Sequence, residues 1–206
     1  MDQLQNILKN EDGFVLVVAL MIMAILSLIG IAGLNTSMFE VQIAGNEWVA
    51  KQTFYQADSG AGLDEQLVFE NAVCATAKGG FTQTNIGGRI VVKDPLLAES
   101  NSIDPVDVSD DDTKRYAVYY PYGLNDTDPH TNFLSQFELK INPGSGLQMV
   151  SGYEGLGAGA AAGGTSRLYV IASQHRGRKS SESLVMTQWR LDNFILANAA
   201  SSDCKY

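Results

Sequence analysis

Residues 14–34 read FVLVVALMIMAILSLIGIAGL, an apolar run without a charged side chain. At about 1.5 Å of rise per residue, a helix of this length spans roughly 30 Å, which is the thickness of the hydrocarbon core of a bilayer. A helix buried in a soluble domain is rarely apolar on every side for so long. The run therefore predicts a transmembrane helix over residues 14–34.

The segment before this run, MDQLQNILKNEDG at residues 1–13, is polar and acidic overall. A secretory signal peptide has a basic start and a shorter apolar stretch of about 7–15 residues, so it fits poorly. A plain signal anchor fits the length of the run. A third alternative, a leader cleaved after Gly13, explains why the glycine stands directly before Phe14 and the apolar run.

This order of a short polar leader, Gly13 and Phe14 before an apolar helix resembles the type IV prepilin signal. In that family a membrane-embedded aspartyl peptidase cuts after the glycine and methylates the new amino terminus. The resemblance implies that the prepilin peptidase removes residues 1–13 and that Phe14 becomes the N-methylated first residue.

Residues 35–72 contain no proline, and their apolar residues recur at helical spacing, which predicts one N-terminal helix over residues 14–72. One narrow stripe consists of Phe39, Ile43, Ala50, Phe54, Ala57, Ala61, Val68 and Ala72. A second stripe on roughly the opposite side consists of Val41, Trp48 and Tyr55. Two stripes indicate one face packed on the protein's own head and one facing neighbouring subunits; a helix inside a larger core is the alternative.

Five glycines interrupt this helix, and each weakens it by about 1 kcal/mol relative to alanine. Bends or melted turns are therefore expected near them. They are Gly30, Gly33, Gly45, Gly60 and Gly62.

The stretch GIAGLNTSMFEVQIAGNEWVAKQTFYQADSGAG at residues 30–62 is similar to the N-terminal region of PilX-type minor pilins. The matching residues are Ala44, Gly45, Asn46, Ala50, Phe54, Tyr55, Ala57, Asp58, Ser59 and Gly60. The resemblance implies an α+β, pilin-like fold, in which the second half of the helix packs on an antiparallel β-sheet head. It also implies a non-catalytic minor pilin of the type IV pilus, acting in assembly initiation or in the tip complex.

The same resemblance implies the location and the partners of the chain. The helix would cross the bacterial inner membrane once, with an extracytoplasmic head, and would later enter a pilus on the cell surface. Other minor pilins, the major pilin and a PilY-type tip adhesin are the expected partners. No cofactor is implied.

Val18 departs from the pattern of major pilins, which place a glutamate at the fifth residue after cleavage. That carboxylate neutralises a neighbour's terminal amine in the apolar filament core, where an unpaired charge costs several kcal/mol. Without it, the subunit fits a filament end or the complex that starts assembly. A minor pseudopilin of a type II secretion system is the closest alternative, followed by a signal-anchored extracytoplasmic binding protein.

From residue 73 onward short β-prone runs alternate with turn signals and predict a head over residues 73–206. The predicted strands are residues 89–93, 116–120, 137–141, 168–172 and 184–191. In the last, Val185, Thr187, Trp189 and Leu191 should share one face. The connection HRGRKSSES predicts a hairpin, and the Gly- and Ala-rich residues 151–166 predict a flexible loop.

The net charge bears on the possible partners, and the two cysteines bear on a possible disulfide. A net charge of −9 argues against nucleic acid as a partner, because phosphate binding needs a surplus of Lys and Arg. In an exported head, an oxidising compartment would favour a disulfide between Cys74 and Cys204; two independent buried thiols are the alternative.

No metalloprotease, nucleophile-elbow, P-loop or Rossmann motif is present, so an enzyme is not predicted. His130 and His175 lie in polar, turn-like sequence without an evident partner. Two acidic clusters, residues 104–112 and 125–128, are best explained as solvated loops. Calcium is the weaker alternative for them, with Asp110, Asp112, Asp126 and Asp128 as candidate ligands.

Overall fold

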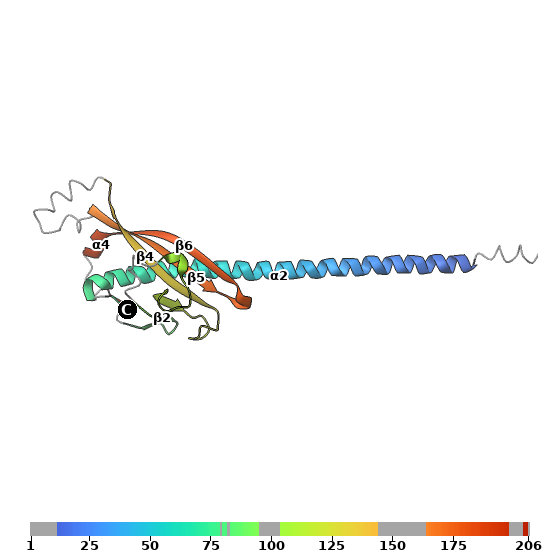
Figure 1. Ribbon diagram of the computed structural model, residues 1–206, viewed down its shortest axis with the longest axis horizontal. Coiled ribbons are helices and arrows are strands. Elements are labelled where there is room, and N and C mark those ends of the chain that lie inside the picture. Colours follow the sequence, from blue (N-terminus) through green and yellow to red (C-terminus); the bar gives the residue numbers. More distant parts are fainter. Residues whose placement is uncertain are drawn as a thin grey trace, which may run out of the picture. The chain divides into compact units, whose positions relative to one another are not determined.

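The computed structural model describes residues 12–78, 80–81, 83–94, 104–143, 164–197 and 204–205. The chain divides into two compact units, residues 1–48 and residues 49–206. In chain order the elements are α2 (Asp12–Lys78), β1 (Asn85–Ile86), β2 (Ile90–Val92), η2 (Pro105–Asp107), β3 (Ala117–Tyr119), β4 (His130–Ile141), β5 (Thr165–Arg176), η4 (Arg178–Ser180), β6 (Glu182–Asp192) and α4 (Asn193–Ala197) (Figure 1).

Helix α2 is unbroken from Asp12 to Lys78 and extends past the predicted end at residue 72. The melted turns expected near its five glycines do not occur. A single glycine costs only about 1 kcal/mol, and helix propagation through the well-formed turns on both sides outweighs this cost.

The strands form one six-stranded sheet in the order β1-β2-β3-β4-β5-β6, and every neighbouring pair is antiparallel. The α+β fold predicted from the sequence is confirmed. Each of the five predicted strands overlaps an observed one, but β4 and β5 begin earlier than predicted. Thr165 and Ser166, expected in the flexible loop, belong to β5; residues 151–163 lie outside the described residues.

The last two strands form the predicted hairpin. His175 pairs with Ser183 and Arg176 with Glu182, and residues 177–181 connect them. Along β6 the side chains alternate as expected: Leu191 is buried, whereas Met186, Gln188 and Arg190 are exposed.

The head core lies between the second part of α2 and the sheet, whose long strands cross the helix (Figure 1). It joins Leu67, Val68, Ala72 and Val73 of the helix to strand residues that include Phe133, Tyr169, Ile171 and Leu191. Val108 covers Leu134 and Ala172 in a smaller second cluster. The sheet is therefore packed on the helix and also partly covered by the segment around η2.

Gly60 allows the close approach of helix and sheet. A Cβ atom at this position would lie 2.9 Å from Thr131 Cγ2 and would also overlap Ser173 Oγ. Any larger residue would force the helix away from β4 and β5. Gly60 is thus required by packing, in addition to being one of the residues that carry the family resemblance.

Candidate assembly helix and polar clusters of the head

The first part of α2 is an apolar, uncharged helix. No charged residue occurs between Phe14 and Phe39, and one window of 18 residues has a mean hydropathy of 3.0. By length and composition this is a helix that could cross a membrane. Its large apolar side chains are exposed, with Phe14 at 71% and Leu34 at 72% of full exposure.

Two hydroxyl groups in this part bond to the helix itself. Ser27 Oγ donates to the Met23 carbonyl at 2.8 Å, and Thr36 Oγ1 donates to the Ala32 carbonyl at 3.1 Å. Hydroxyl groups satisfied in this way do not need water, so neither opposes an apolar environment.

The predicted processing residues lie at the start of α2. Gly13 is in its first turn, with no side chain of another element within 4 Å of an added Cβ, and Phe14 follows it. Val18 stands one turn further on and is partly exposed. Leader residues 1–11 lie outside the described residues, and cleavage stays a prediction.

The first apolar stripe divides into two parts. Ala57, Ala61, Val68 and Ala72 are buried, as predicted for a face packed on the head. Phe39, Ile43, Ala50 and Phe54 are exposed, and so is the whole second stripe of Val41, Trp48 and Tyr55. Exposed apolar side chains on this scale mark a surface that other proteins or lipid cover.

Comparison with known families identifies this part of the chain. The family model described as PilX N-terminal matches residues 12–61. Residues 12–61 are similar to this family and are called the PilX N-terminal segment. The resemblance to PilX-type minor pilins inferred from the sequence is confirmed over this range. A search of curated proteins and of solved structures finds no match.

The PilX N-terminal segment contains Gly13, Phe14 and Val18 and ends at Ala61, one residue after Gly60. Its last turns are attached to the head by a hydroxyl pair, because Thr53 Oγ1 and Ser181 Oγ share a hydrogen bond of 2.8 Å. The part of the match from Thr53 onward therefore belongs to the packed head as well as to the helix.

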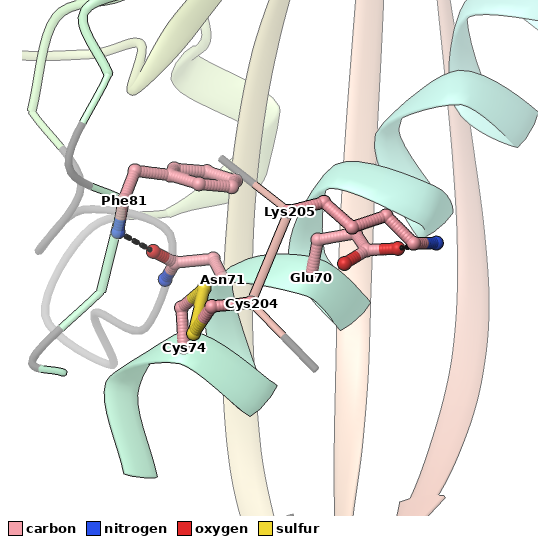
Figure 2. Close-up of a disulfide and its surroundings, with 6 residues drawn as sticks. All are labelled: Glu70, Asn71, Cys74, Phe81, Cys204 and Lys205. Carbon is pink, nitrogen blue, oxygen red and sulfur yellow. Dashed lines mark hydrogen bonds and ion pairs between the residues drawn. A yellow bond between two sulfur atoms is a disulfide. The ribbon is translucent and has the colours of Figure 1, made fainter. Parts of the chain in front are cut away.

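A disulfide between Cys74 and Cys204 fastens the C-terminal residues to α2 (Figure 2). The two Cα atoms are 5.1 Å apart, across a sequence separation of 130. Lys205 Nζ bonds to Glu70 Oε1 at 2.6 Å, on the same stretch of helix. The disulfide expected for an exported head is therefore present in the structure.

Near this bridge, Asn71 of α2 binds the segment that follows the helix. Its Oδ1 accepts the Phe81 N–H at 3.1 Å (Figure 2). Asn71 and Phe81 are both buried, so this bond satisfies polar groups that water does not reach.

Two of the four residues predicted as weak calcium ligands, Asp112 and Asp126, bond to a buried arginine. The Arg115 side chain is 2% exposed. Its Nη2 donates to Asp112 Oδ1 at 2.7 Å and to Asp126 Oδ2 at 3.0 Å. Its hydrogen bonds lower the pKa of Asp126 to about 2.

Asp110 and Asp128 are used differently. Asp110 accepts from His130 Nε2 and Asn132 Nδ2, both at 2.8 Å, and pairs with Arg176. Asp128 contributes its backbone carbonyl to His130 Nδ1. Among the residues that the structure describes, no three or more His, Cys, Asp or Glu side chains are grouped as metal ligands. The carboxylate of Asp110 joins the 104–128 region to β4 and β5, whereas those of Asp112 and Asp126 bond to Arg115 within that region.

Both histidines are in strands rather than in the turn-like surroundings expected from the sequence. His130 begins β4 and His175 lies near the end of β5, and each is 1% exposed. Burial lowers the pKa of His175 to about 4, so its ring is neutral at physiological pH.

Asp64, on the inner face of α2, is a fully buried acid that the sequence did not predict. The Tyr116 hydroxyl donates to Asp64 Oδ1, whereas Oδ2 has no hydrogen-bond partner among the described residues. Burial raises the pKa of Asp64 well above its ordinary value. Asp64 lies at helical spacing from Ala61 and Val68 of the apolar stripe, and this spacing could have indicated that its side chain is buried.

Replacing Asp64 with Asn should change how stability depends on pH. The folded protein retains a proton that the unfolded chain releases near pH 4, so wild-type stability falls as the pH rises from about 4 toward the raised folded pKa. Asp64→Asn removes this decline and should be more stable than the wild type at pH 7. Urea unfolding of the full chain in detergent, at pH values between about 4 and 8, measures this.

Asp58→Asn is the matched control, because Asp58 is an exposed aspartate of the same helix. It should follow the wild-type pH profile. Parallel profiles for Asp64→Asn and the wild type would contradict a protonated, buried Asp64.

Proposed function

We propose that this chain is a minor pilin that takes part in assembly initiation or in the tip complex of a type IV pilus. The PilX N-terminal segment at residues 12–61 is the observation that carries the proposal. The role is structural and non-catalytic, in keeping with a family of structural subunits.

The proposed mechanism has two stages. The uncharged helix first holds the subunit in the inner membrane, with the head on the extracytoplasmic side, and the prepilin peptidase cuts between Gly13 and Phe14. The helix then leaves the membrane and packs its exposed apolar side chains against other pilin helices. Both environments are apolar, so the transfer does not expose this surface to water.

The head would contact other minor pilins, the major pilin and a PilY-type tip adhesin. Val18 supports a place at the filament end, since it has no carboxylate to neutralise the terminal amine of a neighbouring subunit. A subunit that lacks this charge pair is suited to a position that occurs once, and not to one that repeats along the shaft.

Intact-mass measurement and N-terminal sequencing of the protein from sheared surface filaments test this proposal. We expect the mass of residues 14–206 plus one methyl group, with N-methylated Phe14 as the first residue. The same protein from cells without prepilin peptidase should begin at Met1. Intact Met1 in wild-type cells, with the protein confined to membranes, would contradict the pilin assignment. Recovery with secretion pseudopili rather than with surface pili would favour the pseudopilin alternative.

A further inference from the structure

The tip of the β5–β6 hairpin has an unfavourable backbone for its sequence. Lys179 has φ 57° and ψ 35°, and Ser180 also has φ 57°. This left-handed region is costly for residues with a Cβ atom, and hairpin turns usually place Gly, Asn or Asp there. Retaining a lysine and a serine at these two positions therefore needs a reason other than turn formation.

The tip is held firmly. The Gly177 N–H donates to the Ser181 carbonyl at 2.8 Å, and the Ser181 N–H donates to the Arg178 carbonyl at 3.2 Å. Ser181 also bonds to Thr53 of α2. A Cβ atom at Gly177 would lie only 2.6 Å from Ser181 Oγ. The side chains at the tip are thus presented from a fixed backbone.

Two cations at this tip are unpaired. The side chains of Arg178 and Lys179 are exposed and form no hydrogen bond or ion pair with any residue that the structure describes. Arg176, by contrast, pairs with Asp110 and with Glu182. The whole chain has a net charge of −9, so two adjacent cations without an acidic partner form a small positive surface on an acidic protein.

A groove of about 420 Å³ adjoins the two cations, lined by the tip and by residues 126–130. Its wall also contains the carboxylates of Asp128 and Glu182. A phosphate polymer would be repelled by these carboxylates. A protein surface, on which carboxylates alternate with neutral or basic groups, can avoid this repulsion.

We propose that Arg178 and Lys179 form a docking site for a carboxylate-bearing surface of a partner protein. The left-handed backbone at Lys179 and Ser180 fixes how the tip presents Lys179 beside Arg178, and the groove receives the partner's neighbouring residues. This site is separate in sequence from the PilX N-terminal segment and goes beyond the filament function proposed for it.

Fluorescence anisotropy with the full chain in detergent micelles tests the site. The probe is a labelled peptide in which Asp and Glu alternate with Gly and Ser, and its counterpart carries Asn and Gln. We expect binding of the acidic peptide alone, weaker at about 0.15 M salt than at low salt. Lys179→Gly should weaken binding by about fivefold, and the double variant Arg178→Gln, Lys179→Gly by at least about tenfold.

Ser180→Gly distinguishes the effect of the backbone strain from the effect of the lysine charge. Both glycine variants relieve the left-handed backbone and should raise the thermal midpoint by a few degrees, but Ser180→Gly should retain wild-type affinity. Lys140→Gln, which removes an exposed cation paired with Glu138, should also bind as the wild type does.

Three results would overturn the proposal. The first is unchanged affinity in the double variant. The second is an equal loss of affinity in Lys140→Gln, which would indicate nonspecific attraction. The third is tighter binding of polyphosphate than of the acidic peptide, lost in the double variant, which would assign the site to phosphate and not to a protein surface.

Discussion

Replacing Cys74 and Cys204 together with serine should lower the free energy of unfolding of the head by about 5 kcal/mol. The bridge closes a loop of 130 residues, and the chain-entropy model assigns about this value to a loop of that length. An ordinary domain is stable by only about 5–15 kcal/mol, so the loss is a large part of the total.

Trp189 can report this unfolding, because it contacts Tyr169 and Phe69 in the head core. Trp48 is the other of the two tryptophans and is exposed in the first unit, so a Trp48→Phe background isolates the signal. Urea titration of the full chain in detergent should show a lower midpoint for the double serine variant. If that variant does not fold, reduction of the wild-type protein measures the same loss.

Each single serine variant should lose nearly as much stability as the double variant, because either substitution opens the loop. Substitution of Ser201 and Ser202 with alanine is a control for the composition of the same C-terminal segment and should have little effect. A loss below about 1 kcal/mol, for the double variant and for the reduced wild type alike, would show that the bridge is not formed.

The sequence predicted the fold well wherever one physical signal dominated. The apolar run at residues 14–34 is of a kind that is rare in a soluble core, and the PilX match at residues 12–61 agrees with a membrane-type helix. Strand β6 alternates clearly between apolar and polar residues, so both its position and its inward face were predicted correctly.

The prediction of β4 was too short because its first half buries polar residues. Thr131, Asn132 and Ser135 are each at most 2% exposed, and a pattern of this kind resembles a loop in sequence. Cross-strand bonds make their burial tolerable; for example, Asn132 Nδ2 donates to Gln174 Oε1 at 3.0 Å. Such bonds depend on the register of two distant strands and cannot be read from either strand alone.

The acidic residues near positions 104–128 show the same limit. Their number suggested solvated loops or calcium, but their role depends on Arg115, whose burial follows from the fold and not from its neighbours in sequence. Asp64 was overlooked for the related reason that a carboxylate is not expected on a buried helix face. For the acidic residues the missing information was the burial of Arg115, and for Asp64 it was Tyr116, a partner distant along the chain.

Under the proposed function, in which the subunit occupies the filament end, replacing Val18 with glutamate should move it into the shaft. The added carboxylate could neutralise the terminal amine of a neighbouring subunit in the apolar filament core, where leaving that charge unpaired costs several kcal/mol. Since 1.4 kcal/mol corresponds to about a tenfold change in an equilibrium, the ratio of this subunit to the major pilin in sheared filaments should rise at least about tenfold. Quantitative mass spectrometry of head peptides measures that ratio.

Val17→Glu is the matched control, because it places the same carboxylate about 100° around the helix from position 18. Without a neighbouring amine to pair with, that charge opposes transfer into the filament, so the ratio should fall below the wild-type value. An unchanged ratio for Val18→Glu would mean that features of the head, and not the missing glutamate, determine where the subunit stands. A rise in both variants would mean that any added carboxylate acts in this way, and the charge pairing inferred for position 18 would be wrong.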